Sequence, residues 1–177
     1  MDPRTSPDPV SDPQGYQRHL LSLLGDDDPA VVQSGTADSF RALLEVAASD
    51  ATTNPTPTEW SVLQCLAHVT DAEIVVSGRY RWILAHEEPP LLGYDQDLWV
   101  DTLHRPPEPA ESLFAFLEPL RAANIALWHR TPDDRRQRVG MHAERGPESY
   151  DLTFRLIAGH DRFHLGQAER ALDAVRS

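Results

Sequence analysis

The feature that most constrains the fold is a long helical pattern near the C-terminus. Residues 152–172 read "LTFRLIAGHDRFHLGQAERAL". Leu156, His160, His164, Gln167 and Ala171 recur at steps of three and four residues, which place side chains on one face of a helix. The pattern therefore predicts an amphipathic helix that turns two histidines towards the interior of the protein.

Three further long helices are predicted upstream. Pro29 suits the first turn of a helix, and Thr36 is the predicted N-cap for the stretch "ADSFRALLEVAA". Ser61 and Gln64 have the spacing of a capping box, so the next helix should begin near Val62 and end before the prolines at 89 and 90. A helix kinked by Pro119 is predicted over residues 110–130, and Ser149 should cap the last one.

The remaining chain predicts short or irregular structure. A short helix is expected from Gly15 to Leu24, and residues 89–109 form a long connection. No strand-like alternation persists anywhere. We therefore predict an all-α four-helix bundle with an extra N-terminal helix and a long crossover, in one domain over residues 15–177. Residues 1–14 contain four prolines and are expected to be a flexible tail.

Composition narrows the classes of function. The formal net charge is −12, and all 16 cationic residues are arginine, so a nucleic-acid partner is not expected. No apolar run is long enough for a membrane span and no signal peptide is recognised, which predicts a soluble cytoplasmic protein. Cys65 is the single cysteine, which excludes an intrachain disulfide and a Cys-rich zinc site. A buried apolar role is its commoner explanation, although it lies one turn before His68.

The histidines are the main candidates for chemistry. His160 and His164 are one turn apart, a spacing that suits capture of one metal ion. The spacing alone fits equally well a pair of satisfied interior histidines or an exposed pair. His68, on a different predicted helix, could supply a third ligand. Three histidines would leave a coordination position open, which is typical of catalytic rather than structural metal sites.

Four segments resemble the DinB/YfiT-like family of proposed metalloenzymes: "EWSVLQCLAHVTDAE", "GYDQDLW", "RAANIALW" and "LIAGHDRFHLGQAERAL". The resemblance runs from about Tyr16 to Leu172. It implies a four-helix bundle that holds a divalent metal, zinc or nickel, through His68, His160 and His164. It also implies a homodimer.

The family's chemistry is more varied than its fold. Some members transfer low-molecular-weight thiols such as bacillithiol or mycothiol, and others are described as metal-dependent hydrolases. The resemblance therefore implies a metal-dependent thiol S-transferase acting on a small-molecule substrate. A metal-dependent hydrolase and a metal-binding bundle without turnover are the alternatives.

Residues around the proposed metal site have more than one interpretation. Gln167, Asp71, Glu73 and Asp161 could accept a hydrogen bond from a ligand histidine, with Gln167 best placed, and Asp161 or Glu73 could act as a general base. The "GYDQDLW" segment could form a lid that offers Tyr94, Asp95, Asp97 and Trp99, or a crossover anchored by Trp99. His142 is predicted to lie in a surface loop. No pattern supports a role for the other histidines, which are His19, His86, His104 and His129.

Overall fold

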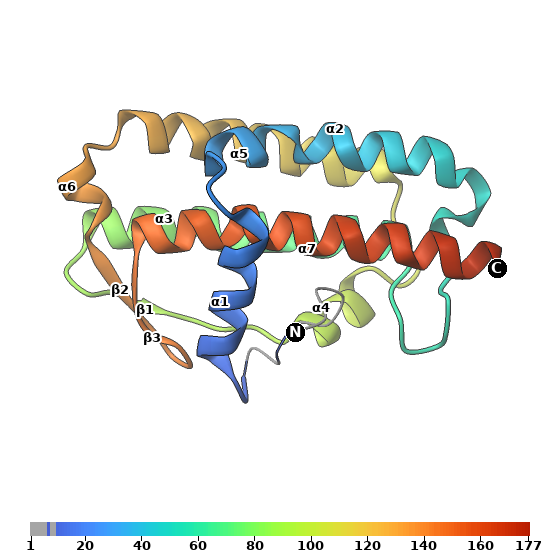
Figure 1. Ribbon diagram of the computed structural model, residues 1–177, viewed down its shortest axis with the longest axis horizontal. Coiled ribbons are helices and arrows are strands. Elements are labelled where there is room, and N and C mark those ends of the chain that lie inside the picture. The colour runs from blue at the N-terminus through green and yellow to red at the C-terminus, as the bar shows by residue number, and fades with distance from the viewer. Residues whose placement is uncertain (1–6, 8–9) are drawn as a thin grey trace.

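Four long helices form the body of the protein in the computed structural model, which describes residue 7 and residues 10–177. They are α2 (Pro29–Ala47), α3 (Val62–Ala85), α5 (Ala110–Arg130) and α7 (Tyr150–Arg176). Helices α3 and α7 lie side by side in one layer, and α2 and α5 form a second layer over them (Figure 1). The predicted four-helix bundle is confirmed.

The helix starts follow from local capping. At the start of α3 the Ser61 hydroxyl accepts the Gln64 N–H at 3.3 Å, and the Ser61 N–H donates to Gln64 Oε1 at 3.0 Å. Together these two bonds form the predicted capping box. Ser149 caps α7 by accepting the Leu152 N–H at 3.0 Å. The predicted bounds of α5 are also confirmed, with Pro119 inside the helix.

The predicted N-cap at Thr36 is wrong, whereas Pro29 does lie in the first turn of a helix, as predicted. The helix begins two turns earlier, at Pro29, where Asp28 accepts the Ala30 N–H at 2.8 Å. Proline at the first helical position behind an aspartate cap is a strong start signal. Thr36 lies inside the helix and is buried, and its hydroxyl donates to Asp161 Oδ2 at 2.8 Å. Its hydrogen bond therefore joins two helices instead of capping one.

Shorter helices complete the fold. They are α1 (Pro13–Leu24), η1 (Ala48–Thr52), α4 (Gln96–Leu103) and α6 (Asp133–Arg136). Helix α1 crosses α7 (Figure 1), and a Cβ at Gly159 would lie 2.1 Å from the Leu20 carbonyl oxygen. Only glycine permits so close a crossing, and it sits directly before His160. Most of the predicted N-terminal tail lies outside the described residues, and α1 begins two residues before the predicted Gly15.

A small sheet corrects the expectation that the chain has no strands. The strands β1 (Pro90–Leu91), β2 (Val139–His142) and β3 (Gly146–Ser149) lie in the order β1-β2-β3. Strand β1 pairs parallel to β2, and β3 pairs antiparallel to it. Strands of two to four residues are too short to show an alternating pattern. The sheet buries His142, which is only 3% exposed, so its predicted place in a surface loop is also wrong.

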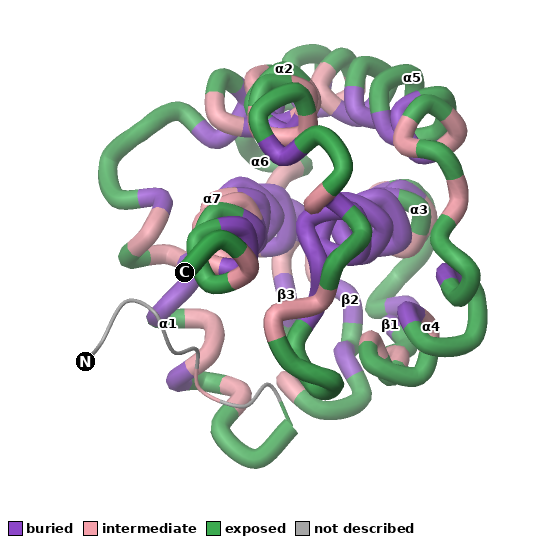
Figure 2. Tube along the Cα trace, turned by 90° about the vertical axis from the view of Figure 1, so that its right-hand side faces the viewer, coloured by how far each residue is buried: buried purple, intermediate pink, exposed green. Residues whose placement is uncertain are grey.

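The apolar core has two parts along the bundle. One part surrounds Phe40, Leu66 and Phe114, and the other surrounds Tyr80 and Phe154. The inward sides of α3 and α7 are buried along much of their length (Figure 2). No helix among the described residues is both long and apolar enough to cross a membrane.

Candidate metal centre

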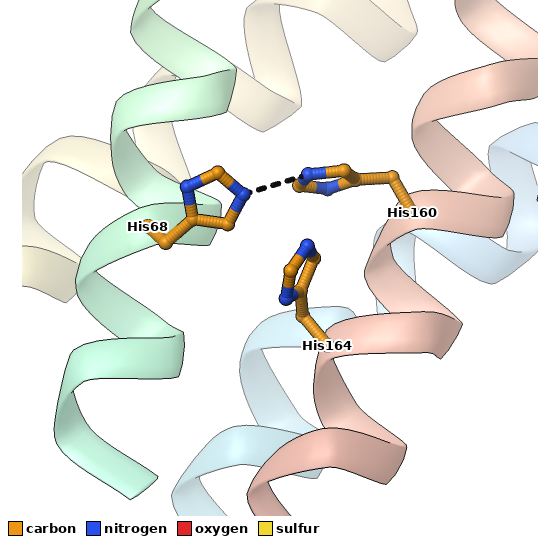
Figure 3. A group of neighbouring side chains, drawn as sticks. All are labelled: His68, His160 and His164. Carbon is orange, nitrogen blue, oxygen red and sulfur yellow. Dashed lines mark hydrogen bonds between the residues drawn. The ribbon is translucent and has the colours of Figure 1, made fainter. Parts of the chain in front are cut away.

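Helices α3 and α7 bring three histidine side chains together inside the bundle. His68 comes from α3, and His160 and His164 come from successive turns of α7. Their rings converge from the two helices (Figure 3), and the Nε2 atoms of His68 and His160 are 2.9 Å apart. Each residue offers one nitrogen, and these three atoms lie within 4.8 Å of one another. The helical spacing on α7 and the packing of α3 therefore build one cluster.

The cluster fits a divalent metal on its own chemistry. Zinc–nitrogen bonds of about 2.0–2.1 Å in a tetrahedral site place two ligand nitrogens roughly 3.3 Å apart. The nitrogens of His68 and His160 are 2.9 Å apart, and all three ligand atoms lie within 4.8 Å of one another. Burial lowers the pKa of His164 to about 4, and lowers the pKa of His68 and His160 well below the usual value. Positive charge on a neighbouring histidine further lowers the pKa of His68 and His160. All three imidazoles are therefore neutral at pH 7, as metal ligands must be.

Gln167 orients one of the three rings. His164 Nδ1 donates to Gln167 Oε1 at 2.9 Å, since an amide oxygen can only accept. This bond fixes the tautomer and leaves Nε2 of His164 free to ligate. By contrast, Nδ1 of His68 and Nδ1 of His160 are buried without a hydrogen-bond partner in the described part of the chain. Trp60 closes one side, with its ring centroid 4.9 Å from that of His68.

Asp71 does not reach the cluster. Its carboxylate contacts His104, with Oδ2 2.9 Å from Nε2, and the other ring nitrogen of that histidine lies 2.9 Å from Glu108 Oε1. His104 is only 6% exposed, so a histidine for which the sequence offered no pattern has a defined place between two carboxylates.

Glu73 and Asp161, the two candidate bases, face an arginine instead of the histidines. Arg121 of α5 lies between them, with its Nε 3.0 Å from Glu73 Oε2 and its Nη1 paired with Asp161 Oδ2. Asn124 also donates to Glu73 Oε1, at 2.6 Å. The two carboxylates and the guanidinium are all 5% exposed or less. Their arrangement is that of a buried ion network linking three helices.

Cys65 is fully buried in the apolar core. Burial raises the pKa of its thiol to about 12, so the thiol stays protonated at neutral pH. It is not part of the three-histidine cluster, in agreement with the apolar interpretation.

A cavity of about 430 Å³ reaches the cluster, and His68 and His160 line it. Residues 93–97 of the "GYDQDLW" segment also line this cavity, and the Tyr94 ring lies 6.4 Å from that of His68. A second cavity, of about 350 Å³, is lined by His164 and Gln167. Asp97 lines both cavities, whereas Trp99 packs on Tyr94 with ring centroids 4.5 Å apart. The segment thus has cavity-lining residues and an aromatic anchor.

The first cavity also contains two residues that the sequence did not single out for function, Arg79 and His142. Arg79 follows His68 by eleven residues, which is three helical turns and returns to almost the same face. That spacing could have identified Arg79 from the sequence as a residue on the same helix face as His68. His142 gave no such signal, because its position depends on the small sheet.

Taken together, fold and site define a class: a helical bundle with a buried three-histidine centre that opens into a cavity. Residues 34–168 match the DinB superfamily, which is more than half of the chain. The chain therefore belongs to the DinB superfamily.

Two individual proteins extend this comparison. The chain is 24% identical over 116 residues to a protein of Oceanobacillus iheyensis named "Putative metal-dependent hydrolase OB0413". That match covers 64% of this chain and 65% of the relative, which is just under two thirds of its length. The fold is similar to that of YfiT from Bacillus subtilis, with a TM-score of 0.75 at 19% identity over 82% of this chain and 84% of that one. YfiT is described as "a probable metal-dependent hydrolase with an unusual four-helix bundle topology".

Proposed function

We propose that the protein is a metal-dependent enzyme that transfers a low-molecular-weight thiol to a small electrophilic substrate. One observation carries the proposal: two of the three clustered histidines line a cavity of about 430 Å³, a volume typical of small-molecule sites. A metal site without turnover needs no such opening. The coarser conclusion, a metal-dependent function, rests on the cluster together with the family.

The choice of thiol transfer rests on where the carboxylates lie. Hydrolysis needs a base or an orienting group beside the water, and Glu73 and Asp161 are both held by Arg121. Thiol transfer needs a thiolate and a positioned electrophile. A carbon–sulfur bond then forms, the leaving group departs with its electron pair, and the thiol proton passes to solvent.

A divalent metal, which we propose to be zinc or nickel, would supply a Lewis acid that lowers the pKa of a thiol or a water. The chain's own contribution is the neutral charge of its three imidazoles. Neutral ligands leave the full charge of the cation available, whereas carboxylate ligands would offset part of it. The Trp60 ring beside His68 also limits the access of water to the cluster.

Hydrolysis is the second candidate, because the relative and the structural neighbour both carry that description. For this chain it would require a base other than the two buried carboxylates. Asp97 lines both cavities and is the carboxylate we would assign to that role. A cytoplasmic location and a homodimer belong to the proposal as well.

The experiment begins with elemental analysis of the purified protein, which should find about one divalent metal per chain. The metal-loaded protein is then assayed with bacillithiol and mycothiol against a haloaromatic electrophile, and separately with ester and amide substrates. Turnover should require thiol and should be lost in His160→Leu/His164→Leu. The matched control is His129→Leu, an exposed histidine on α5, which should behave as the wild type.

Thiol-independent cleavage of esters or amides would establish hydrolysis instead. Stoichiometric metal with no turnover in either assay would favour a binding bundle. Absence of metal from both the purified and the reconstituted protein would overturn the whole proposal.

A further inference from the structure

One face of α3 forms a continuous wall of the 430 Å³ cavity. His68, Ala72, Val75, Val76 and Arg79 all line it. The wall runs from the metal centre to a cation, and the two ends are eleven residues or roughly 16 Å apart along the helix axis. The cavity is therefore long and chemically different at its two ends.

In the described part of the chain, no carboxylate forms an ion pair with Arg79, and Glu148 acts on its charge only without such a contact. It is only 6% exposed, and among the described residues its side chain makes one hydrogen bond, from Nη2 to the Leu92 carbonyl oxygen. Its Nε is buried and has no hydrogen-bond partner in the part of the chain that the structure describes. Burial, and then the positive charge of Arg145, lowers the pKa of Arg79.

Arg145 lines the same cavity but, unlike Arg79, is paired with a carboxylate. Its guanidinium is paired with the fully buried Glu148, with Nε 2.5 Å from Oε1. Burying a guanidinium without such a partner is costly. Arg79 therefore has an unmet preference for an anion.

His142 supplies a second donor to this end of the cavity. Its Nδ1 accepts the Glu144 N–H at 3.2 Å, so in the neutral ring the proton is on Nε2. That Nε2 is buried and has no partner among the described residues. Burial, and then the positive charge of Arg145, lowers the pKa of His142 to about 4. The ring is thus a neutral N–H donor at pH 7.

The small sheet holds the two donors near each other. Strand β1 pairs Leu91 with His142 of β2, and the next residue, Leu92, accepts the bond from Arg79. A guanidinium and an imidazole N–H, both buried and both short of an acceptor, line one cavity. A carboxylate has the charge and the acceptor oxygens that these two donors lack.

We propose that Arg79 and His142 form a subsite for a carboxylate, so that the molecule bound in this cavity is a small monocarboxylic acid. One uncompensated cation favours one negative charge. The exposed side chains of Asp95, Asp97 and Glu144 also line the cavity, and they disfavour a dianion such as a phosphate monoester. We add that the reactive end of this acid lies at the histidines, and this addition rests on the proposed function. The subsite itself does not.

The test compares acids with their own amides by isothermal titration calorimetry. N-acetylcysteine and N-acetylcysteinamide are titrated into the zinc-loaded protein, and 4-phenylbutyrate and 4-phenylbutanamide into the metal-free protein. In both pairs the acid should bind at least tenfold more tightly than the amide. The preference should vanish in Arg79→Gln and weaken severalfold in His142→Phe, with the fold of each variant checked by its melting temperature.

The matched control is Arg135→Gln. Arg135 also donates to a backbone carbonyl, that of Leu84 at 3.2 Å, but it is exposed and lies outside the cavity. This variant should keep the preference for the acid. If Arg79→Gln fails to fold, the preference of His142→Phe relative to the wild type decides.

Equal affinity for acid and amide in the wild type overturns the subsite, as does a preference that survives Arg79→Gln or the absence of binding by either acid. Tighter binding of a matched phosphonate would overturn the choice of a monoanion. Loss of thiol transfer with an intact acid preference would refute the proposed function and leave the subsite standing.

Discussion

Replacing Arg121 tests how much the buried ion network of Arg121, Glu73 and Asp161 stabilises the packing of the helices around the metal centre. Replacing Arg121 by methionine keeps much of the side-chain volume but removes the charge between Glu73 and Asp161. Both carboxylates are 3% exposed or less, so water cannot solvate the negative charge that the substitution leaves without a partner. Removing one partner of a buried ion pair costs about 3–5 kcal/mol. For a domain of this size the melting temperature should fall by roughly 6–20 °C.

The loss should depend on pH in a defined direction. Burial raises the pKa of Glu73, and Arg121 is the largest influence that lowers it. Without Arg121 that pKa rises further above its unfolded-state value, so the folded state binds protons more readily than the unfolded state. Acidification then favours folding at this residue. The stability deficit of the variant should therefore shrink as the pH falls from 7 towards 5.

The assay is urea unfolding followed by circular dichroism at pH 7 and pH 5.5. A variant that combines Glu73→Gln, Arg121→Met and Asp161→Asn removes all three charges and should regain most of the loss. Arg41→Met is the partly exposed comparison, because Arg41 also contacts two carboxylates, Glu111 at 2.7 Å and Glu118 at 2.8 Å, but its side chain is 34% exposed. It should change stability far less. An Arg121→Met deficit no larger than that of Arg41→Met, or one that grows on acidification, would refute the reasoning.

Four further predictions concern the metal centre and assembly. Chelation at pH 7.5 should lower the melting temperature by several degrees, because a metal at a thousandfold excess over Kd stabilises the folded state by about 4 kcal/mol; His160→Leu/His164→Leu should not respond. Because burial lowers the pKa of His164 to about 4, the metal-free protein should lose stability as pH falls from 6.5 to 4, measurable by denaturant titration. Gln167→Leu should weaken metal affinity by about 10–100-fold in a competition assay with a chromogenic chelator. Sedimentation should show a homodimer at micromolar concentration, and a monomer alone would contradict that expectation.

The sequence predicted those parts of the fold that depend on local chemistry. Capping residues and prolines determine the ends of α3 and α5, and a helical repeat places His160 and His164 on one face. The N-cap of α2 was placed at Thr36 instead of Asp28 because the start signals at Pro29 and Thr36 fall within one helix, and the hydroxyl of Thr36 bonds to Asp161 on another helix. A tertiary contact of that kind leaves no local trace.

The candidate site, like the fold, has parts that local sequence patterns indicate and parts that depend on tertiary contacts. The position of His68 opposite the α7 pair could be suspected, and Gln167 was ranked first of the four acidic or amide side chains that could orient a ligand, in keeping with its bond to His164. Three carboxylates have stronger partners: Asp71 contacts His104, while Glu73 and Asp161 share Arg121. Arg121 could have been identified from the sequence as a partner for these carboxylates, because its place in the helical repeat puts it on the buried core face of α5.

The carboxylates of the ion network lie on the same two helices as the histidines, and we infer that this is why buried charge is kept in a bundle that could pack without it. Glu73 follows His68 by five residues on α3, and Asp161 is the residue after His160 on α7. Arg121 from α5 contacts both carboxylates, so it sets the register between the two ligand-bearing helices. Apolar packing would stabilise several registers almost equally, whereas a buried charge tolerates only the one in which both partners are met. A metal centre that draws on two helices requires that single register, because sliding one helix by a turn would move His68 by about 5 Å along the helix axis relative to His160.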